Sequence, residues 1–120
     1  MKDLHYQSKD WGSNVKLGVY NGVSVWHGFV EQCGKCSIHH HHYHANEIAA
    51  INSVLCIEYF NDDLRIIDSV IIGHKQSVVV PSRSIHRFRV LESGDIMEVY
   101  WVDRQDAENN SDFDIIRHSL

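Results

Sequence analysis

The sequence predicts an all-β protein, built as an antiparallel sandwich or barrel, and three observations support this fold class. Short runs rich in β-branched and aromatic residues follow one another along the chain. Clusters of turn-forming residues separate these runs. The spacing of the runs is that of short strands joined by turns, which is typical of sandwiches and barrels.

The predicted strands follow in chain order, each bounded by turn residues. They are 15–20, 23–30, 36–43, 54–60, 64–72, 77–80, 85–91 and 96–102. The turns between them include Asn21-Gly22, Asn52-Ser53, Asn61-Asp62-Asp63 and Ser93-Gly94-Asp95. One segment, 44–51, is ambiguous, because its order of Ala, Glu and Ile suits a helix equally well.

Length and composition limit the class of protein. A chain of 120 residues forms one domain, 1–120, with a single core, and its 43% hydrophobic content is that of a globular protein. No apolar run reaches the roughly 18 residues of a membrane helix, and the N-terminus lacks the apolar core of a secretory signal, so we expect a cytoplasmic protein without membrane partners. A net charge of −5 without a basic stripe argues against nucleic acid as a partner.

Three cysteines are present, and this odd count argues against a disulfide framework. Cys33 and Cys36 have the spacing of half a zinc site, to which the neighbouring histidines would add ligands. The chain has no second cysteine pair, so we favour reduced structural thiols for Cys33, Cys36 and Cys56.

Histidines form the most distinctive feature of the sequence. Five of the ten lie within the six positions 39–44, and His86 follows Pro81 later in the chain. Imidazoles from two separated strands are typical ligands of a metal ion. On a strand, His39 and His41 share one face and His40 and His42 the other, whereas a helix would pair His40 with His44. The spacing alone leaves both possibilities open.

Several motifs, in their order and spacing, resemble one family. They are Trp11-Gly12, the run 34–41, the run 76–81, His86-Arg87-Phe88, Glu98-Val99 and Asp114-Ile115-Ile116-Arg117. The chain resembles small single-domain cupins, phage-like members included, that are similar to the cupin domain of type II mannose-6-phosphate isomerases. The resemblance implies an antiparallel jelly-roll β-barrel with a first motif at about 34–54 and a second at about 75–90. We also expect a homodimer.

The resemblance implies a site for one divalent metal ion, which would be Zn, Mn, Fe, Co or Ni. His39, His41 and His86 match three of the family's ligands, and Asn46 stands where the family has a glutamate. Ser53, at the position of a family turn glycine, supports this register and predicts that 44–51 is a loop entering a strand. A second register, with His40, His42 and Glu47 as ligands, restores the carboxylate and stays open.

Three further residues are candidates for binding or catalysis. Glu98 shares a strand face with Ile96 and Tyr100, so it is a candidate base in the barrel or one half of a buried ion pair. Arg83 replaces the usual glycine of its turn, and Arg117 matches the family's last arginine. Both are candidates for binding an anionic substrate, although Arg117 alternatively forms a salt bridge with Asp112 or Asp114.

The expected function is to bind a sugar or sugar phosphate as a small-molecule ligand beside the metal. The reaction that the resemblance implies is metal-dependent isomerisation of that sugar phosphate. Two alternatives stay open: a three-histidine iron dioxygenase and a non-catalytic ligand-binding cupin.

Overall fold

The computed structural model describes residues 5–102 and 115–119, and these residues form strands and turns. Among them no helix is long and apolar enough to cross a membrane. The strands are β1 (His5–Lys9), β2 (Gly12–Tyr20), β3 (Val23–Val30), β4 (Ile38–His41), β5 (His44–Ala50), β6 (Val54–Phe60), β7 (Ile66–Gly73), β8 (Gln76–Val80), β9 (His86–Glu92), β10 (Gly94–Val102) and β11 (Ile115–His118).

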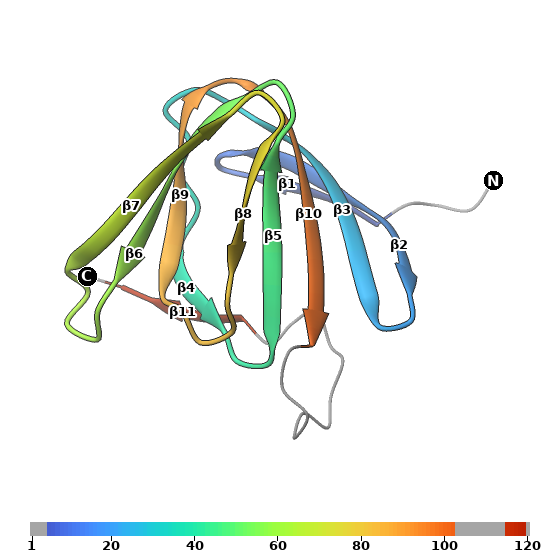
Figure 1. Cartoon of the computed structure of the whole chain (residues 1–120). Coiled ribbons are helices and arrows are strands. Elements are labelled where there is room, and N and C mark those ends of the chain that lie inside the picture. The colour runs from blue at the N-terminus through green and yellow to red at the C-terminus, as the bar shows by residue number, and fades with distance from the viewer. Residues whose placement is uncertain (1–4, 103–114, 120) are drawn as a thin grey trace.

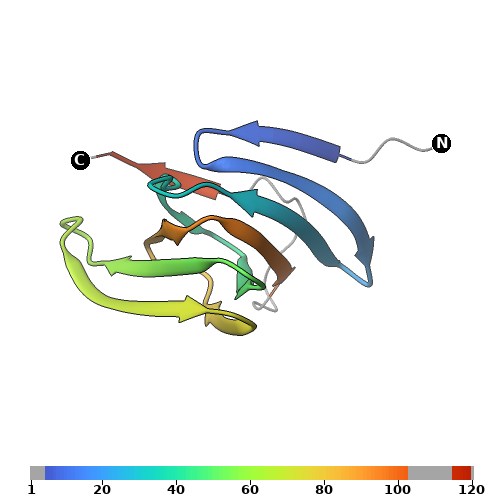
Figure 2. The same ribbon diagram turned by 90° about the horizontal axis from the view of Figure 1, so that it is seen from above.

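The strands form two antiparallel sheets that face each other (Figure 1). One sheet has the order β1-β2-β3-β10-β5-β8 and the other the order β11-β4-β9-β6-β7. The edge strands β7 and β8 contact each other and join the two sheets on one side. Seen from above, β1 and β2 lie on the opposite side from β7 and β8 (Figure 2). The predicted all-β, antiparallel jelly-roll architecture is confirmed.

Alternate residues of the strands fill the space between the sheets, because successive side chains on a strand point to opposite faces. Trp11 and Phe88 pack edge to face there, with ring centroids 5.1 Å apart. Each fully buried aliphatic side chain contributes about 1.5–3 kcal/mol through removal from water. The remaining buried core residues are Val30, Ile48, Ala50, Leu55, Ile57, Ile72, Val80, Val90 and Ile96.

The ambiguous segment is a strand. As predicted, 44–51 is not a helix, but the prediction of a loop was wrong, because His44–Ala50 forms β5. This strand pairs with β10 on one side and β8 on the other. Strand partners on both sides satisfy the backbone hydrogen bonds of the segment, and such tertiary pairing outweighs local helix propensity.

Two further strands, besides β5, lie outside the eight predicted runs. They are β1, at the edge of the first sheet, and β11, at the edge of the second. The predicted turn at Asn21-Gly22 joins β2 to β3, and both residues have positive φ, 50° and 78°. This conformation is typical of a tight hairpin turn, and glycine adopts it without a steric cost.

Candidate metal centre

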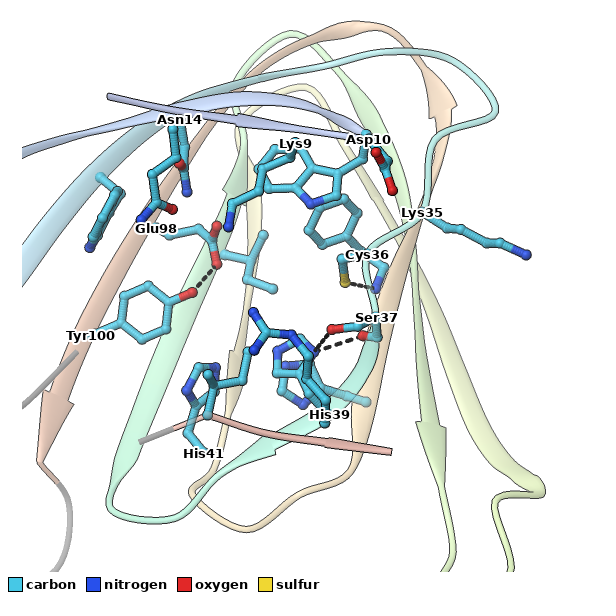
Figure 3. Close-up of a pocket in the computed structure, with 18 residues that line it drawn as sticks. Lys9, Asp10, Asn14, Lys35, Cys36, Ser37, His39, His41, Glu98 and Tyr100 are labelled. Atoms are coloured by element: carbon cyan, nitrogen blue, oxygen red, sulfur yellow. Dashed lines mark hydrogen bonds between the residues drawn. The ribbon is translucent and has the colours of Figure 1, made fainter. Parts of the chain in front are cut away.

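Three histidines from two strands meet between the sheets. His39 and His41 lie on the inner face of β4, and His86 begins β9, where its backbone pairs with His39. One nitrogen from each ring lies within 4.8 Å of the other two, and all three side chains are buried. Figure 3 shows His39 and His41 at one end of the cavity between the sheets. The sequence-predicted convergence of these imidazoles is therefore present.

Backbone carbonyls orient two of the rings. His39 Nδ1 lies 2.7 Å from the Ser37 carbonyl oxygen, and His86 Nδ1 lies 2.7 Å from that of Ser84. A carbonyl only accepts hydrogen bonds, so each Nδ1 donates its proton. The lone pair of each ring is then on Nε2, and such hydrogen bonds hold metal-binding histidines in the required tautomer.

Burial keeps His39 and His86 uncharged at neutral pH. It lowers the pKa of His39 to about 2, with a further contribution from neighbouring His86. Burial likewise lowers the pKa of His86 to about 4. Metal ions bind the neutral form of histidine, so the three residues fit a metal ion. Imidazole ligands suit Zn, Fe, Co and Ni and do not by themselves select among them.

Asn46 and Glu47 lie on opposite faces of β5. Asn46 is buried on the inner face of β5, where its Nδ2 donates to Glu98 Oε2 at 3.3 Å. Within the described residues, its Oδ1 is buried without a hydrogen-bond donor. Asn46 is not among the residues that line the cavity. Its side chain is thus directed inward, as the first register predicts, and its hydrogen bond goes to Glu98.

The residues of the second register do not come together. Glu47 accepts a 2.7 Å hydrogen bond from the Ser77 hydroxyl on the outer face of the sheet. His40 Nδ1 lies 2.8 Å from His118 Nε2, and the His42 ring lies beside Arg83. In this structure, His40, His42 and Glu47 lie apart from the group formed by His39, His41 and His86. Alternation along β4 and β5 directs His40 and Glu47 away from the space between the sheets.

Glu98 lines the same cavity as the three histidines. Its carboxylate is buried and accepts hydrogen bonds from the Tyr100 hydroxyl, at 2.7 Å, and from Asn46. Burial raises the pKa of Glu98, although the bond from Tyr100 lowers it. A carboxyl group with a raised pKa holds and releases a proton closer to neutral pH, which suits a general acid or base.

The cavity has a volume of about 330 Å³. Its charged lining residues are Lys9, Asp10, Lys35, Glu98 and Arg117, and its aromatic ones are Trp11, Trp26, Phe88 and Tyr100. Lys9 comes from β1 and lies near Glu98 in Figure 3. Its positive charge lowers the pKa of Glu98. Lys9 was not predicted as a site residue, because β1 carries neither a motif nor a clear strand pattern.

The two candidate arginines have different locations. Arg117 lines the cavity from β11, directly across from His39 on β4. Its alternative partners, Asp112 and Asp114, lie outside the described residues. Arg83 is not among the residues that line the cavity. It occupies the β8–β9 turn with φ of 66°, and its Nη2 lies 3.2 Å from His42 Nε2.

The cysteines form no metal clip within the described part of the chain. The three free thiols are Cys33, Cys36 and Cys56, and the one group of potential metal ligands contains histidines alone. Cys36 lines the cavity and accepts a hydrogen bond from the Phe88 N–H at 3.2 Å. Burial raises the pKa of this thiol to about 12, so it stays protonated and unreactive at neutral pH.

No protein-family model and no curated protein matches this sequence. Solved structures do match its fold. The capsular polysaccharide assembling protein CapF from Staphylococcus aureus aligns with a TM-score of 0.74 at 15% identity, over 100% of this chain and 35% of CapF. A variant of Bacillus subtilis oxalate decarboxylase aligns with a TM-score of 0.74 at 16% identity, over 96% of this chain and 30% of that protein.

A third similar structure is an RmlC-like cupin from Shewanella frigidimarina. It has a TM-score of 0.65 at 13% identity, over 87% of this chain and 86% of its own. The chain thus spans about a third of CapF and oxalate decarboxylase, but most of this smaller cupin. Two facing antiparallel sheets, inward histidines from β4 and β9 and these similarities agree, and the chain has the cupin fold.

Proposed function

We propose that this protein binds one divalent metal ion through His39, His41 and His86, and a sugar phosphate or similar small anion beside it. We further propose that Glu98 moves a proton between adjacent carbons of that ligand, which is the chemistry of a sugar-phosphate isomerase. One observation carries the proposal: a buried carboxyl group with a raised pKa lines the same cavity as three buried imidazoles that lie within reach of one ion.

The cavity suits a small ligand with a negative charge and an apolar face. Its volume of about 330 Å³ is at the small end of ligand pockets. Arg117 and Lys9 line it and provide positive charge for a phosphate. Trp11 and Trp26 provide flat apolar surfaces for the carbon skeleton of a sugar. The sequence resemblance to type II mannose-6-phosphate isomerases supports the same ligand class.

Each residue has a defined part in the proposed reaction. A metal ion held by the three histidines would supply a Lewis acid that polarises the carbonyl of the ligand. Glu98 would take a proton from the hydroxyl-bearing carbon next to this carbonyl and return it to the former carbonyl carbon. The hydroxyl proton would pass to the former carbonyl oxygen, so that the old hydroxyl becomes the new carbonyl. Tyr100 orients the carboxyl group through its 2.7 Å hydrogen bond, while Arg117 holds the ligand's phosphate.

Solvent-proton exchange tests the reaction. Protein prepared without a histidine tag is loaded with Zn, Mn, Fe, Co or Ni, and NMR in deuterated water follows deuterium entry next to the carbonyl of aldose and ketose phosphates. We expect exchange in the wild type and its loss in Glu98→Gln, with metal content unchanged. Exchange that continues in Glu98→Gln would exclude Glu98 as the base.

A matched pair of arginine variants tests ligand binding. Sugar phosphates should raise the melting temperature of the metal-loaded protein, because a ligand that binds only the folded state stabilises it. Arg117→Gln should abolish most of this shift. Arg83→Gln, which removes the same positive charge away from the cavity, should leave it intact. Equal loss in both variants would point to general electrostatics instead of a phosphate contact.

An iron dioxygenase is the second candidate. It is favoured by the absence of any carboxylate from the three-histidine group in the described residues, a ligand set that suits ferrous iron. Tightly bound iron together with oxygen consumption would favour this reaction over isomerisation. Metal and ligand binding without turnover would instead indicate a ligand-binding cupin.

A further inference from the structure

A second group of histidines lies on the opposite face of β4 from the metal centre. His40 and His118 point away from the space between the sheets, and His40 Nδ1 lies 2.8 Å from His118 Nε2. Their ring centroids are 5.0 Å apart, with an angle of 36° between the ring planes. Both side chains are half-buried. Neither residue has a part in the proposed function.

Strand register brings these two rings together. In the β4–β11 pairing, His40 is opposite Ile116 and His118 is opposite Ile38. His40 and His118 are therefore diagonal neighbours on one face of an antiparallel pair, a distance that long side chains bridge easily. The contact is a product of the sheet and is not visible in the sequence, where the two residues are far apart.

The distance between the two nitrogens suits a shared metal ion. Two nitrogens bound at about 2.0–2.1 Å to one ion in neighbouring positions lie roughly 3 Å apart. The present 2.8 Å separation is within a small ring rotation of that geometry. Whichever ring now donates would move its proton to its other nitrogen, so that both facing atoms present lone pairs and both rings stay neutral.

We propose that His40 and His118 form a second, outer metal site that takes a transition-metal ion, with water in the remaining positions. The affinity should follow the usual order for imidazole ligands, with Cu²⁺ above Ni²⁺ and Zn²⁺, and Mn²⁺ weakest. His42 is not a ligand in this arrangement, because its Nε2 lies 3.2 Å from Arg83 Nη2 and its ring centroid is 6.5 Å from that of His40.

The site would act on the cavity through β11. This strand has four residues and β4 as its partner in the sheet, so backbone pairing alone holds it weakly. The inner face of β11 carries Arg117 and Ile115, which line the cavity. An ion that links His118 to His40 would tie this cavity wall to the strand that carries His39 and His41.

Metal stoichiometry tests the proposal. Equilibrium dialysis against Cu²⁺, followed by metal analysis, should give two equivalents for the wild type and one for His40→Gln and for His118→Gln. The control is His74→Gln, at an exposed histidine, which should retain two equivalents. Two equivalents in His118→Gln, or one in the wild type, would overturn the proposal. So would loss of an equivalent in His42→Gln with retention in His118→Gln.

A measurement on the wild type removes any dependence on the folding of variants. Substoichiometric Cu²⁺ added to the Zn-loaded protein should broaden the ring NMR signals of His40 and His118 before those of His74. Uniform broadening of exposed histidines would show only nonspecific binding and would refute the site.

Discussion

The four consecutive histidines 39–42 lie in two different environments. His39 and His41 are 8% and 6% exposed and face His86 between the sheets. His40 and His42 are half-buried on the outer face, where His40 contacts His118 and His42 contacts Arg83. Identical side chains at consecutive positions, at the end of β4 and just after it, therefore differ in partners and exposure. Their chemical role depends on the face of the strand, which alternates at every residue.

The histidines differ in partners and in exposure, and the difference in exposure has the larger effect on the chemistry of their rings. On the inner face burial removes water, lowers the pKa of His39 and His86 and leaves their neutral rings close to each other, as a metal ion requires. On the outer face, solvent competes for the same groups.

Substitutions of neighbouring histidines should differ most in their effect on metal affinity. His41→Gln should weaken binding of Zn²⁺ or Mn²⁺ at the inner site by more than about 100-fold, because removal of a hydrogen-bond partner of a ligand already costs 10–100-fold. His42→Gln, one residue away on the other face, should leave the affinity unchanged. Calorimetric titration of the metal-free protein measures both. Equal weakening would mean that the strand does not separate the two rings.

The stability of the metal-free protein should fall in mild acid. The folded-state pKa values of His39 and His86 are below the ordinary 6.5, so below that pH the unfolded chain binds more protons than the folded one. The free energy of unfolding should therefore decrease from pH 6.5 toward pH 4, by up to about 1.4 kcal/mol per pH unit for each histidine.

Urea unfolding in the presence of a chelator, at several values between pH 7.5 and pH 4.5, measures this dependence. His39→Gln should make the profile shallower. Val90→Ala, which destabilises the core without changing a titratable group, should shift the profile without changing its slope. A wild-type profile that is flat between pH 6.5 and pH 4.5 would contradict neutral, buried imidazoles.

Two hydrogen bonds of equal length allow the inner and outer faces to be compared for carboxylates as well. The Tyr100 hydroxyl donates to buried Glu98 at 2.7 Å, and the Ser77 hydroxyl donates to Glu47 on the outer face, also at 2.7 Å. Tyr100→Phe should reduce the free energy of unfolding by about 1–2 kcal/mol and raise the pKa of Glu98 further. Ser77→Ala should cost less than about 0.5 kcal/mol.

Denaturant unfolding and carboxyl ¹³C NMR titration give the two readouts for these variants. A cost for Ser77→Ala as large as that for Tyr100→Phe would show that burial does not control the strength of these bonds.

The smallest effect is expected at the β8–β9 turn. Arg83 has φ of 66°, a conformation that costs a non-glycine residue about 1–2 kcal/mol. Arg83→Gly removes this cost but adds backbone entropy to the unfolded chain and loses the contact with His42. We expect a net gain of about 0.5 kcal/mol in the free energy of unfolding, with ligand binding unchanged. Weaker ligand binding in Arg83→Gly would indicate that Arg83 contributes to the ligand site.

Local sequence patterns were enough to predict the all-β fold class and most strand positions. Runs of β-branched and aromatic residues and turns such as Asn21-Gly22 act locally, through side-chain packing and backbone conformation. Given the strand predicted at 36–43, alternation also places His39 and His41 on one face. The position of His86 beside them followed from the family resemblance.

The other features of the fold and the site depend on contacts between strands that are distant in the sequence. Segment 44–50 is a strand because β8 and β10 pair with it, and Asn46 faces Glu98 because these strands lie side by side. Lys9 reaches the cavity from an edge strand without a recognisable motif, Arg117 lines the cavity while Arg83 does not, and His40 meets His118 across β4 and β11. These contacts join residues far apart in the chain, and strand order and register, which local patterns do not encode, bring them together.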